Sequence, residues 1–264
     1  MADVHYTHPR LAAIYDLDSP WGADSDFYKA LAEPAPRSIL DLGCGTGTLC
    51  NELAQAGHRV TGIDPAAAML EAARRKPYAG DIEWVQSTAQ EYRSDERFDL
   101  IVMTGHAFQV LLTDTDVLNT FSNMRRHLAV GGVVAFESRN PAIDWNTRWP
   151  RSFVWELAEG KVHQSRSDLN TEGELVSFEH SFRFPDETLV SPSTLRFMHR
   201  TRIEALLLQS GLGVAGLYGD WNASPFVETS SPEMIFVARA LSLNSGGRPL
   251  RARAGSLRNS GGSS

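Results

Sequence analysis

The sequence DLGCGTG at residues 41–47 is the stretch that decides the fold. It follows a short apolar run at 37–42 and precedes a segment, 48–56, whose leucines recur at helical spacing. Glycine at alternate positions removes the Cβ atom where a backbone turns sharply, and lets a ligand lie against main-chain N–H groups. The stretch therefore predicts a strand, a loop and a helix that together hold a nucleotide-like ligand.

The spacing of the glycines narrows the choice of ligand. A dinucleotide fingerprint needs a third glycine three residues after the second, and that position is Thr48, which argues against NAD. No Gly-Lys-Ser/Thr follows, as a phosphate-binding P-loop would require. Asp41 would repel a pyrophosphate but suits a cationic amine. S-adenosylmethionine, which carries a ribose, an adenine, an ammonium and a sulfonium but no phosphate, fits these demands.

A second acid lies at the spacing expected for a ribose ligand. Asp64 follows the apolar run 59–63 and stands 21 residues after Gly43, and an acid about 20 residues after the loop binds ribose hydroxyls in this architecture. With both motifs in place, the chain resembles the class I S-adenosylmethionine-dependent methyltransferases over residues 35–140 and, more weakly, 200–240. Two alternatives stay open: a non-catalytic S-adenosylmethionine-binding regulatory module and, less favoured, a nicotinamide-dependent oxidoreductase.

The resemblance implies which residues hold the S-adenosylmethionine cofactor. One departure from the family concerns the turn after the third strand, which usually reads Gly-Asp-Ala and binds the adenine amine through its acid. Residues 87–90 here read Ser-Thr-Ala-Gln, so the adenine contacts are left to Thr88, Gln90 or backbone atoms. The implied cofactor residues are the two acids, the loop glycines and their neighbours in the fold: Tyr15, Asp41, Gly43, Gly45, Gly47, Asp64, Pro65, Met69, Thr88, Ala89 and Thr104.

Methyl transfer is an in-line displacement, so orientation and exclusion of water can supply much of the catalysis. His106, after the fourth strand, is the candidate base, or else positions the acceptor or supports the structure. Gln109, about one helical turn later, either holds a polar acceptor group or caps the backbone. Glu137, Arg139 and Asn140 follow the fifth strand and could meet the acceptor, although Arg139 and Glu137 could instead form a plain ion pair.

Aromatic residues outside the glycine loop leave further alternatives. The tryptophans at 145, 149, 155 and 221 could line an aromatic acceptor pocket or pack between sheets. His180 lies among phenylalanines, where packing is a commoner role than catalysis. Tyr6, Tyr15, Trp21 and Tyr28 precede the first strand, in an arm that often folds over the cofactor in the family.

Short apolar strands alternate with helices through most of the chain, which predicts a doubly wound, mostly parallel sheet. Pro65 is expected at the first position of the second helix, Leu128 in the helix that ends before Gly131, and Thr201 and Glu204 as a capping box. The predicted strands of this sheet are 37–42, 59–63, 82–86, 98–103, 133–138, 214–218 and 234–238.

The alternation stops after Asn140 for about sixty residues, too long for an ordinary loop. Period-two patterns at 153–157, 178–184 and 194–198 predict a small antiparallel insert. The expected domains are a helical arm over the cofactor at 1–32, a Rossmann-like methyltransferase domain at 33–140 and 200–240, the insert as an acceptor cap at 141–199, and a disordered tail at 241–264. By layout this is similar to small-molecule enzymes such as sugar N-methyltransferases of antibiotic pathways.

Charge and composition restrict the partners. The net charge is −7 although four arginines lie after Ala240, so the acidic body is a poor binder of nucleic acid. The Asp/Asn-Pro-Pro-Tyr/Phe run that base-amine methyltransferases usually carry after strand four is absent, since residues 104–109 read TGHAFQ. Cys44 and Cys50 have no Cys-x-x-Cys spacing, which argues against a zinc site or a disulfide. Without a leader or a long apolar run, we expect a cytoplasmic enzyme with a small-molecule acceptor and no membrane or metal partner.

Overall fold

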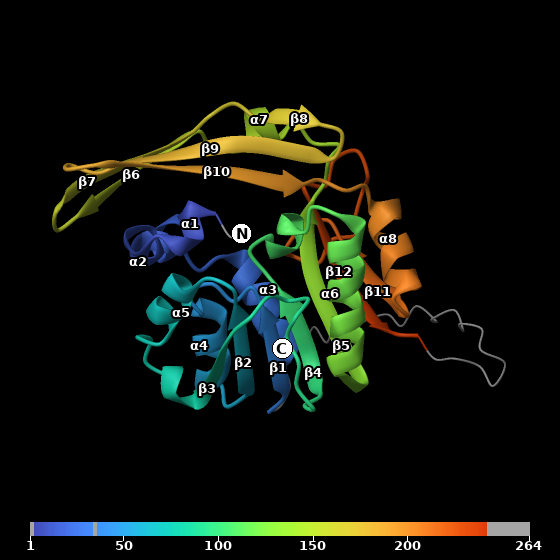
Figure 1. The fold of residues 1–264 in the computed structure, drawn as a ribbon. Coiled ribbons are helices and arrows are strands. Elements are labelled where there is room, and N and C mark those ends of the chain that lie inside the picture. Colours follow the sequence, from blue (N-terminus) through green and yellow to red (C-terminus); the bar gives the residue numbers. More distant parts are fainter. Residues whose placement is uncertain (1–2, 34–35, 242–264) are drawn as a thin grey trace, which may run out of the picture.

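A computed structural model describes residues 3–33 and 36–241. It contains a seven-stranded sheet covered by helices on both faces, and a five-stranded antiparallel sheet that lies across the carboxyl ends of the first sheet's parallel strands (Figure 1). The predicted fold class, a doubly wound mostly parallel sheet with an antiparallel insert, is confirmed. Among the described residues, no helix is both long and apolar enough to cross a membrane.

The large sheet has the strand order β11-β12-β5-β4-β1-β2-β3. The order reverses beside β1, because β2 lies on one side of it and β4 on the other, and ligands bind at such a reversal, outside the carboxyl ends of the strands. β12 and β11 run antiparallel at the far edge. The strands are β1 Ser38–Leu42, β2 Arg59–Asp64, β3 Ile82–Gln86, β4 Phe98–Met103, β5 Leu128–Arg139, β11 Leu212–Tyr218 and β12 Glu233–Ala240.

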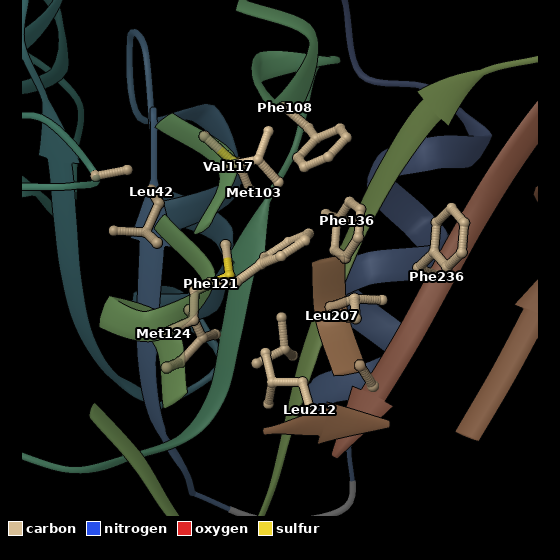
Figure 2. Packing of buried hydrophobic residues seen from close by; sticks show 14 of the residues in the cluster. Leu42, Met103, Phe108, Val117, Phe121, Met124, Phe136, Leu207, Leu212 and Phe236 are labelled. Atoms are coloured by element: carbon tan, nitrogen blue, oxygen red, sulfur yellow. The ribbon is translucent and has the colours of Figure 1, made fainter. Parts of the chain in front are cut away.

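Helices cover the two faces because alternate strand residues point to opposite sides. Along β5, Val133 and Ala135 pack toward α3 (Ala23–Ala32) and α4 (Thr48–Gln55), whereas Val134 and Phe136 pack toward α6 (Asp114–His127) and α8 (Arg200–Gln209). α5 (Ala67–Ala73) lies beside β2 and β3. The α6 side is rich in aromatic rings, and Figure 2 shows Phe108, Phe121, Phe136 and Phe236 side by side.

The insert begins with α7 (Trp145–Arg148) and continues as the sheet order β10-β9-β7-β6, with β8 paired to β9. The sequence patterns indicate three of these strands but miss β7 and β8. In β7 the inward residues are Val162, Gln164 and Arg166, so two of the three buried side chains are polar and no apolar alternation results. The strands are β6 Ser152–Leu157, β7 Gly160–Arg166, β8 Asn170–Glu172, β9 Leu175–Arg183 and β10 Thr188–Arg196.

The N-terminal arm, α1 (Val4–Thr7) and α2 (Pro9–Asp18), lies between the two sheets (Figure 1). Leu11 and Ile14 pack into the apolar core of the insert, with Val162, Phe182 and Phe184. Ala12 packs on the other side against Met69 of α5. The arm therefore joins the insert to the methyltransferase domain through apolar contacts in both directions.

Three local expectations are wrong. α5 begins at Ala67, so Pro65 precedes the helix, because the Asp64 carboxylate accepts the N–H of Ala66 and holds the chain extended there. α8 begins at Arg200 without a side-chain cap, and Glu204 lies near Arg200 instead of forming a box with Thr201.

Leu128 opens β5 opposite Phe98, so this strand starts before Gly131 instead of after Gly132. Two short 3-10 helices, η1 (Ala79–Asp81) and η2 (Ala107–Val110), complete the described elements. Residues 242–264, nearly all of the predicted disordered tail, lie outside the described residues.

Candidate functional site

The glycine loop connects β1 to α4 in a conformation that side chains disfavour. Gly43, Gly45 and Gly47 have φ angles of +79°, +54° and +72°. A Cβ atom on Gly47 would stand 2.3 Å from the indole ring of Trp84. Both the backbone conformation and the space therefore require glycine at position 47.

The N–H groups of this loop bond mostly within the protein. Gly43 and Cys44 donate to the carbonyl of Ile63, at 2.7 and 2.9 Å, and Gly47 donates to Cys44 at 2.9 Å. Gly45 donates to the Asp64 carboxylate at 2.9 Å. A ligand therefore meets the shape of the loop, the uncapped first turn of α4 and two nearby carboxylates.

Asp41 supplies the first of these carboxylates. Its Oδ2 accepts from the Cys50 thiol at 3.3 Å, but within the described part of the chain its buried Oδ1 has no hydrogen-bond partner. Burial raises the pKa of Asp41 to about 7. An unsatisfied buried carboxylate oxygen is costly, and a ligand ammonium would satisfy it.

Asp64 supplies the second carboxylate. It accepts from Gly45 through Oδ2 and from Ala66 through Oδ1, at 2.9 and 2.8 Å. Burial raises its pKa, while these two N–H bonds act in the opposite direction. Because a carboxylate oxygen accepts more than one hydrogen bond, both oxygens keep capacity for ribose hydroxyls. The orphaned oxygen of Asp41, the glycine loop and Asp64 together fit S-adenosylmethionine.

A cleft of about 80 Å³ separates the glycine loop from the arm and the start of α3. Of the predicted cofactor residues, the lining contains Tyr15, Asp41, Gly43, Gly45 and Thr104.

Asp16 fastens the arm over this cleft. Its carboxylate accepts from the hydroxyls of Thr46 and Thr48 on the loop side, the second at 3.2 Å. It also pairs with Lys76 at 2.5 Å. These contacts close the arm against the residues that surround the cleft.

The other predicted cofactor residues lie around the cleft without lining it. Met69 is buried under the arm near Tyr15, and Pro65 is exposed beyond Asp64. The Thr88 hydroxyl donates to the Glu91 carboxylate at 3.0 Å and accepts from the Glu91 N–H at 3.2 Å. Thr88 faces a separate open groove beside α6, and Ala89 is in the core. Their roles toward adenine stay predictions.

An acidic cluster, His106 with Glu137 and Glu233, lies next to the cleft, which reaches Gly105. His106 has a φ of +60°, and its N–H donates to Glu137 Oε1 at 2.5 Å. Its Nε2 lies 3.0 Å from Glu233 Oε2. Tyr28 donates its hydroxyl to the other oxygen of Glu137, and burial raises the pKa of Glu137.

Gln109 and Arg139 form a second polar group beneath the insert. Gln109 is fully buried; its amide donates to the carbonyl of Arg196 at 3.2 Å and accepts from Arg139 Nη1 at 2.9 Å. The guanidinium of Arg139 lies 4.3 Å from the ring centroid of Trp149 and 5.6 Å from that of Trp145. Burial lowers the pKa of Arg139.

The ion pair considered for Arg139 and Glu137 does not form. Within residues 3–33 and 36–241, no carboxylate oxygen lies within 4.0 Å of Arg139. Asn140 has a structural use, since its amide donates at 2.8 Å to the carbonyls of Glu228 and Ser231, in the segment before β12. Arg139 thus remains the charged residue at the end of β5 whose use needs an explanation.

The remaining aromatic candidates separate into different places. His180 packs against Phe178 and Phe182, and burial lowers its pKa to about 4, which agrees with a packing role. Trp155 packs against the apolar cluster of the insert that also contains Leu11 and Ile14 of the arm. Trp221 packs on Phe27 of α3. The four tryptophans therefore do not form one pocket, and only Trp145 and Trp149 flank Arg139.

Sequence reasoning missed two polar residues of the site. Glu233 precedes the apolar run of β12, and only the pairing of β12 with β5 brings it beside His106. The signal available in the sequence was that Glu233, an acid, directly precedes the predicted strand at 234–238. Asp16 carried no signal, because its partners Thr46 and Lys76 are distant in the sequence.

Comparison with known proteins agrees with this geometry. A family model described as a methyltransferase domain matches residues 39–132. The cypemycin N-terminal methyltransferase of a Streptomyces species is 31% identical over 206 residues, which cover 77% of this chain and 83% of that relative. This alignment is longer than the matched domain.

Solved structures share the fold. The CcbJ methyltransferase from Streptomyces caelestis has a TM-score of 0.71 at 20% identity, with 86% of this chain and 96% of that chain covered. CalS10 from Micromonospora echinaspora, an amino pentose methyltransferase solved with S-adenosylmethionine bound, has a TM-score of 0.64 at 18% identity, with 85% and 95% covered. The chain belongs to the class I S-adenosylmethionine-dependent methyltransferases, and S-adenosylmethionine is its cofactor.

Proposed function

We propose that this methyltransferase is an N-methyltransferase of a small amine, and that the acidic cluster of His106, Glu137 and Glu233 receives the amine. The observation that carries the proposal is the convergence of two glutamates on one histidine beside the cofactor cleft. Two carboxylates attract an ammonium and can take its proton, whereas they would repel a phenolate or carboxylate nucleophile.

The cluster's chemistry suits an amine that must lose a proton before it attacks. When bound, S-adenosylmethionine supplies an electrophilic methyl carbon on its sulfonium. Glu137 is a stronger base than an exposed carboxylate because burial raises its pKa. His106, bonded to Glu233, can pass the proton outward. The amine's lone pair then forms the N–C bond as the C–S bond breaks, in a space from which the insert excludes water.

The same proposal assigns roles to the parts of the chain. The cofactor is held by the predicted residues around the glycine loop, the arm at 1–32 covers it, and the insert at 141–199 caps the acceptor. Arm residues in the cleft lining support the first two roles. The net charge of −7 supports a small acceptor over nucleic acid, and the free thiols Cys44 and Cys50 are in keeping with the reducing cytoplasm.

The names of two related proteins also support nitrogen as the acceptor atom. The cypemycin enzyme is named for methylation of an N-terminus, and CalS10 acts on an amino pentose. These acceptors differ in size and shape, but each offers an amine. The shared chemistry, not either molecule, is what we transfer to this chain.

The proposal is tested by methyl transfer to matched amines and alcohols, with S-adenosylhomocysteine release as the readout between pH 6 and 9. We expect turnover of amines, and Glu137→Gln should lower kcat by about 10²-fold or more without changing the affinity for S-adenosylhomocysteine in calorimetry. Glu71→Gln, an exposed glutamate on α5, is the control and should act like the wild type. Preference for alcohols, or full activity of Glu137→Gln, would reject the proposal.

A further inference from the structure

We propose that the acceptor carries a carboxylate as well as its amine, and that Arg139 binds this carboxylate. The inference rests on the proposed N-methylation and specifies its substrate class as an amino acid or a similar aminocarboxylate. It begins from a half-buried guanidinium that the described chain leaves without an anion.

Arg139 lies near the acidic cluster both along β5 and across the sheet to β12. It follows Glu137 by two residues on β5, so both side chains leave the same face of the strand, with Cα atoms about 7 Å apart. Across the sheet, Arg139 is the register partner of Glu233 on β12. A ligand whose amine and carboxylate are separated by one or two carbons could therefore reach the cluster with one end and Arg139 with the other.

The fork of Arg139 is only partly used. Nη1 donates to Gln109 at 2.9 Å, and this is the one hydrogen bond of the guanidinium to another described residue. Nε and Nη2 remain as two parallel donors along one edge, the arrangement that a carboxylate accepts in bidentate fashion. Stacking on Trp149 at 4.3 Å fixes the plane of this edge before a ligand arrives.

Two buried arginines show how the fold treats a guanidinium that it uses for structure. Arg196 lies 2.8 Å from Asp114 and 2.7 Å from Glu174. Arg166 donates to the carbonyls of Ser167 and Trp149, at 2.6 and 3.1 Å. Arg139 has neither a carboxylate nor two carbonyls. Arg139 is half-buried, and an anion from outside would pair a charge that the described chain leaves without a carboxylate.

The surrounding charges favour a carboxylate over other anions. Glu137 and Glu233 act on Arg139 through space, and both would repel a phosphate dianion more than a carboxylate. A zwitterion matches both ends, since its ammonium faces the two glutamates and its carboxylate faces Arg139. A neutral amino sugar would leave the arginine unpaired.

The test uses acceptor trios that differ in one group, such as L-phenylalanine, L-phenylalaninamide and phenethylamine, and the same trios of smaller amino acids. The wild type should prefer the best amino acid over its amide by about 30-fold or more in kcat/KM. Arg139→Gln should abolish this preference through KM, and Arg139→Lys should restore part of it because the charge remains without the fork. Affinity for S-adenosylhomocysteine should not change in either variant.

A binding measurement separates ligand recognition from a structural role. With S-adenosylhomocysteine bound, phenylacetate should raise the Tm of the wild type more than phenylacetamide does, and Arg139→Gln should lose the difference. The unliganded Arg139→Gln protein should melt close to the wild type, whereas Arg196→Gln, which strands two carboxylates, should melt clearly lower. A loss of Tm in Arg139→Gln as large as in Arg196→Gln would make Arg139 a structural residue and overturn the inference.

The acceptor results also distinguish the two proposals. If amines without a carboxylate are methylated equally well by the wild type and Arg139→Gln, N-methylation stands and the carboxylate site is rejected. If hydroxy acids replace amino acids as acceptors and still depend on Arg139, the carboxylate site stands and N-methylation is rejected.

Discussion

The two sides of the site are built in different ways. The cofactor side consists of consecutive residues, 41–47, held by main-chain hydrogen bonds and by glycines with positive φ. The proposed acceptor side consists of single residues from α3, β5, β12 and the position before η2, held together by hydrogen bonds to the carboxylates of Glu137 and Glu233. We therefore expect changes on the cofactor side to act through backbone geometry and to be abrupt, and changes on the acceptor side to be graded and dependent on pH.

The largest effect should come from Gly47→Ala. The new methyl group would meet the Trp84 ring, which the bond from its indole N–H to the Ala79 carbonyl, at 3.0 Å, holds in place. Strain and overpacking together should lower the free energy of unfolding by about 3 kcal/mol, measured in urea. Gly57→Ala is the matched control, with φ of +86° and open space, and should cost about 1 kcal/mol. Equal losses of unfolding free energy in the two variants would show that the glycine loop relaxes around the new methyl group and is not rigid.

Asp41→Asn removes a titrating carboxyl from the cofactor side. Because burial raises the pKa of Asp41 from 3.8 to about 7, the folded state holds this proton more tightly than the unfolded state, and stability is lost as the pH rises between these values. The variant should match the wild type near pH 4 and be more stable than the wild type by on the order of 4 kcal/mol above pH 7.

The difference between the Asp41→Asn and wild-type curves is the quantity to compare. Asp18, whose pKa burial raises to about 6, and His5 and His180, whose pKa values burial lowers to about 3 and about 4, also titrate in this range. Their contributions cancel in the difference, which denaturant unfolding at several pH values supplies. A difference that does not vary with pH would mean that Asp41 keeps its ordinary pKa.

Asp64→Ala should weaken cofactor binding by about 2 kcal/mol, or roughly 30-fold, in calorimetry with S-adenosylhomocysteine. The substitution removes the acceptor of the N–H groups of Gly45 and Ala66 together with the ribose ligand. Asp81→Ala, at an exposed acid of η1, should leave the affinity unchanged. Unaltered affinity in Asp64→Ala would remove this residue from the cofactor site.

Tyr28→Phe should have the smallest effect and the clearest pH signature. The Tyr28 hydroxyl bonds to Glu137 and holds its pKa down, so its removal should raise this pKa further and shift the acid limb of the kcat profile to higher pH. The cost in stability should be about 1 kcal/mol. If the limb stays in place, Glu137 is not the group that titrates in catalysis.

The sequence predicts the loop between β1 and α4 and the end of β2 well, because the interactions that form them are local. The turn at 41–47 and the acid at position 64 are separated by one helix, and β3 and β4 have the predicted bounds because apolar runs define them. The predicted place of Pro65 in the helix is wrong because a hydrogen bond from the backbone N–H of Ala66 to the Asp64 carboxylate, not a helix preference, sets the chain direction there.

The acceptor side is assembled by pairings that no local pattern encodes. Glu233 reaches His106 from 127 residues away, through the antiparallel pairing of β12 with β5. Similarly, β7 buries Gln164 and Arg166, so a search for apolar alternation does not find it. Polar residues that become buried by long-range pairing are the part of this molecule that sequence patterns do not reveal.

The double attachment of the arm has a kinetic consequence. Leu11 and Ile14 pack into the insert, Asp16 accepts a hydrogen bond from Thr46 of the glycine loop, and the arm lines the cofactor cleft. Any movement of the arm that opens the cofactor cleft therefore also displaces the insert. We expect departure of S-adenosylhomocysteine to require the insert to loosen its hold on the methylated product, so that product release, not methyl transfer, sets the pace of turnover.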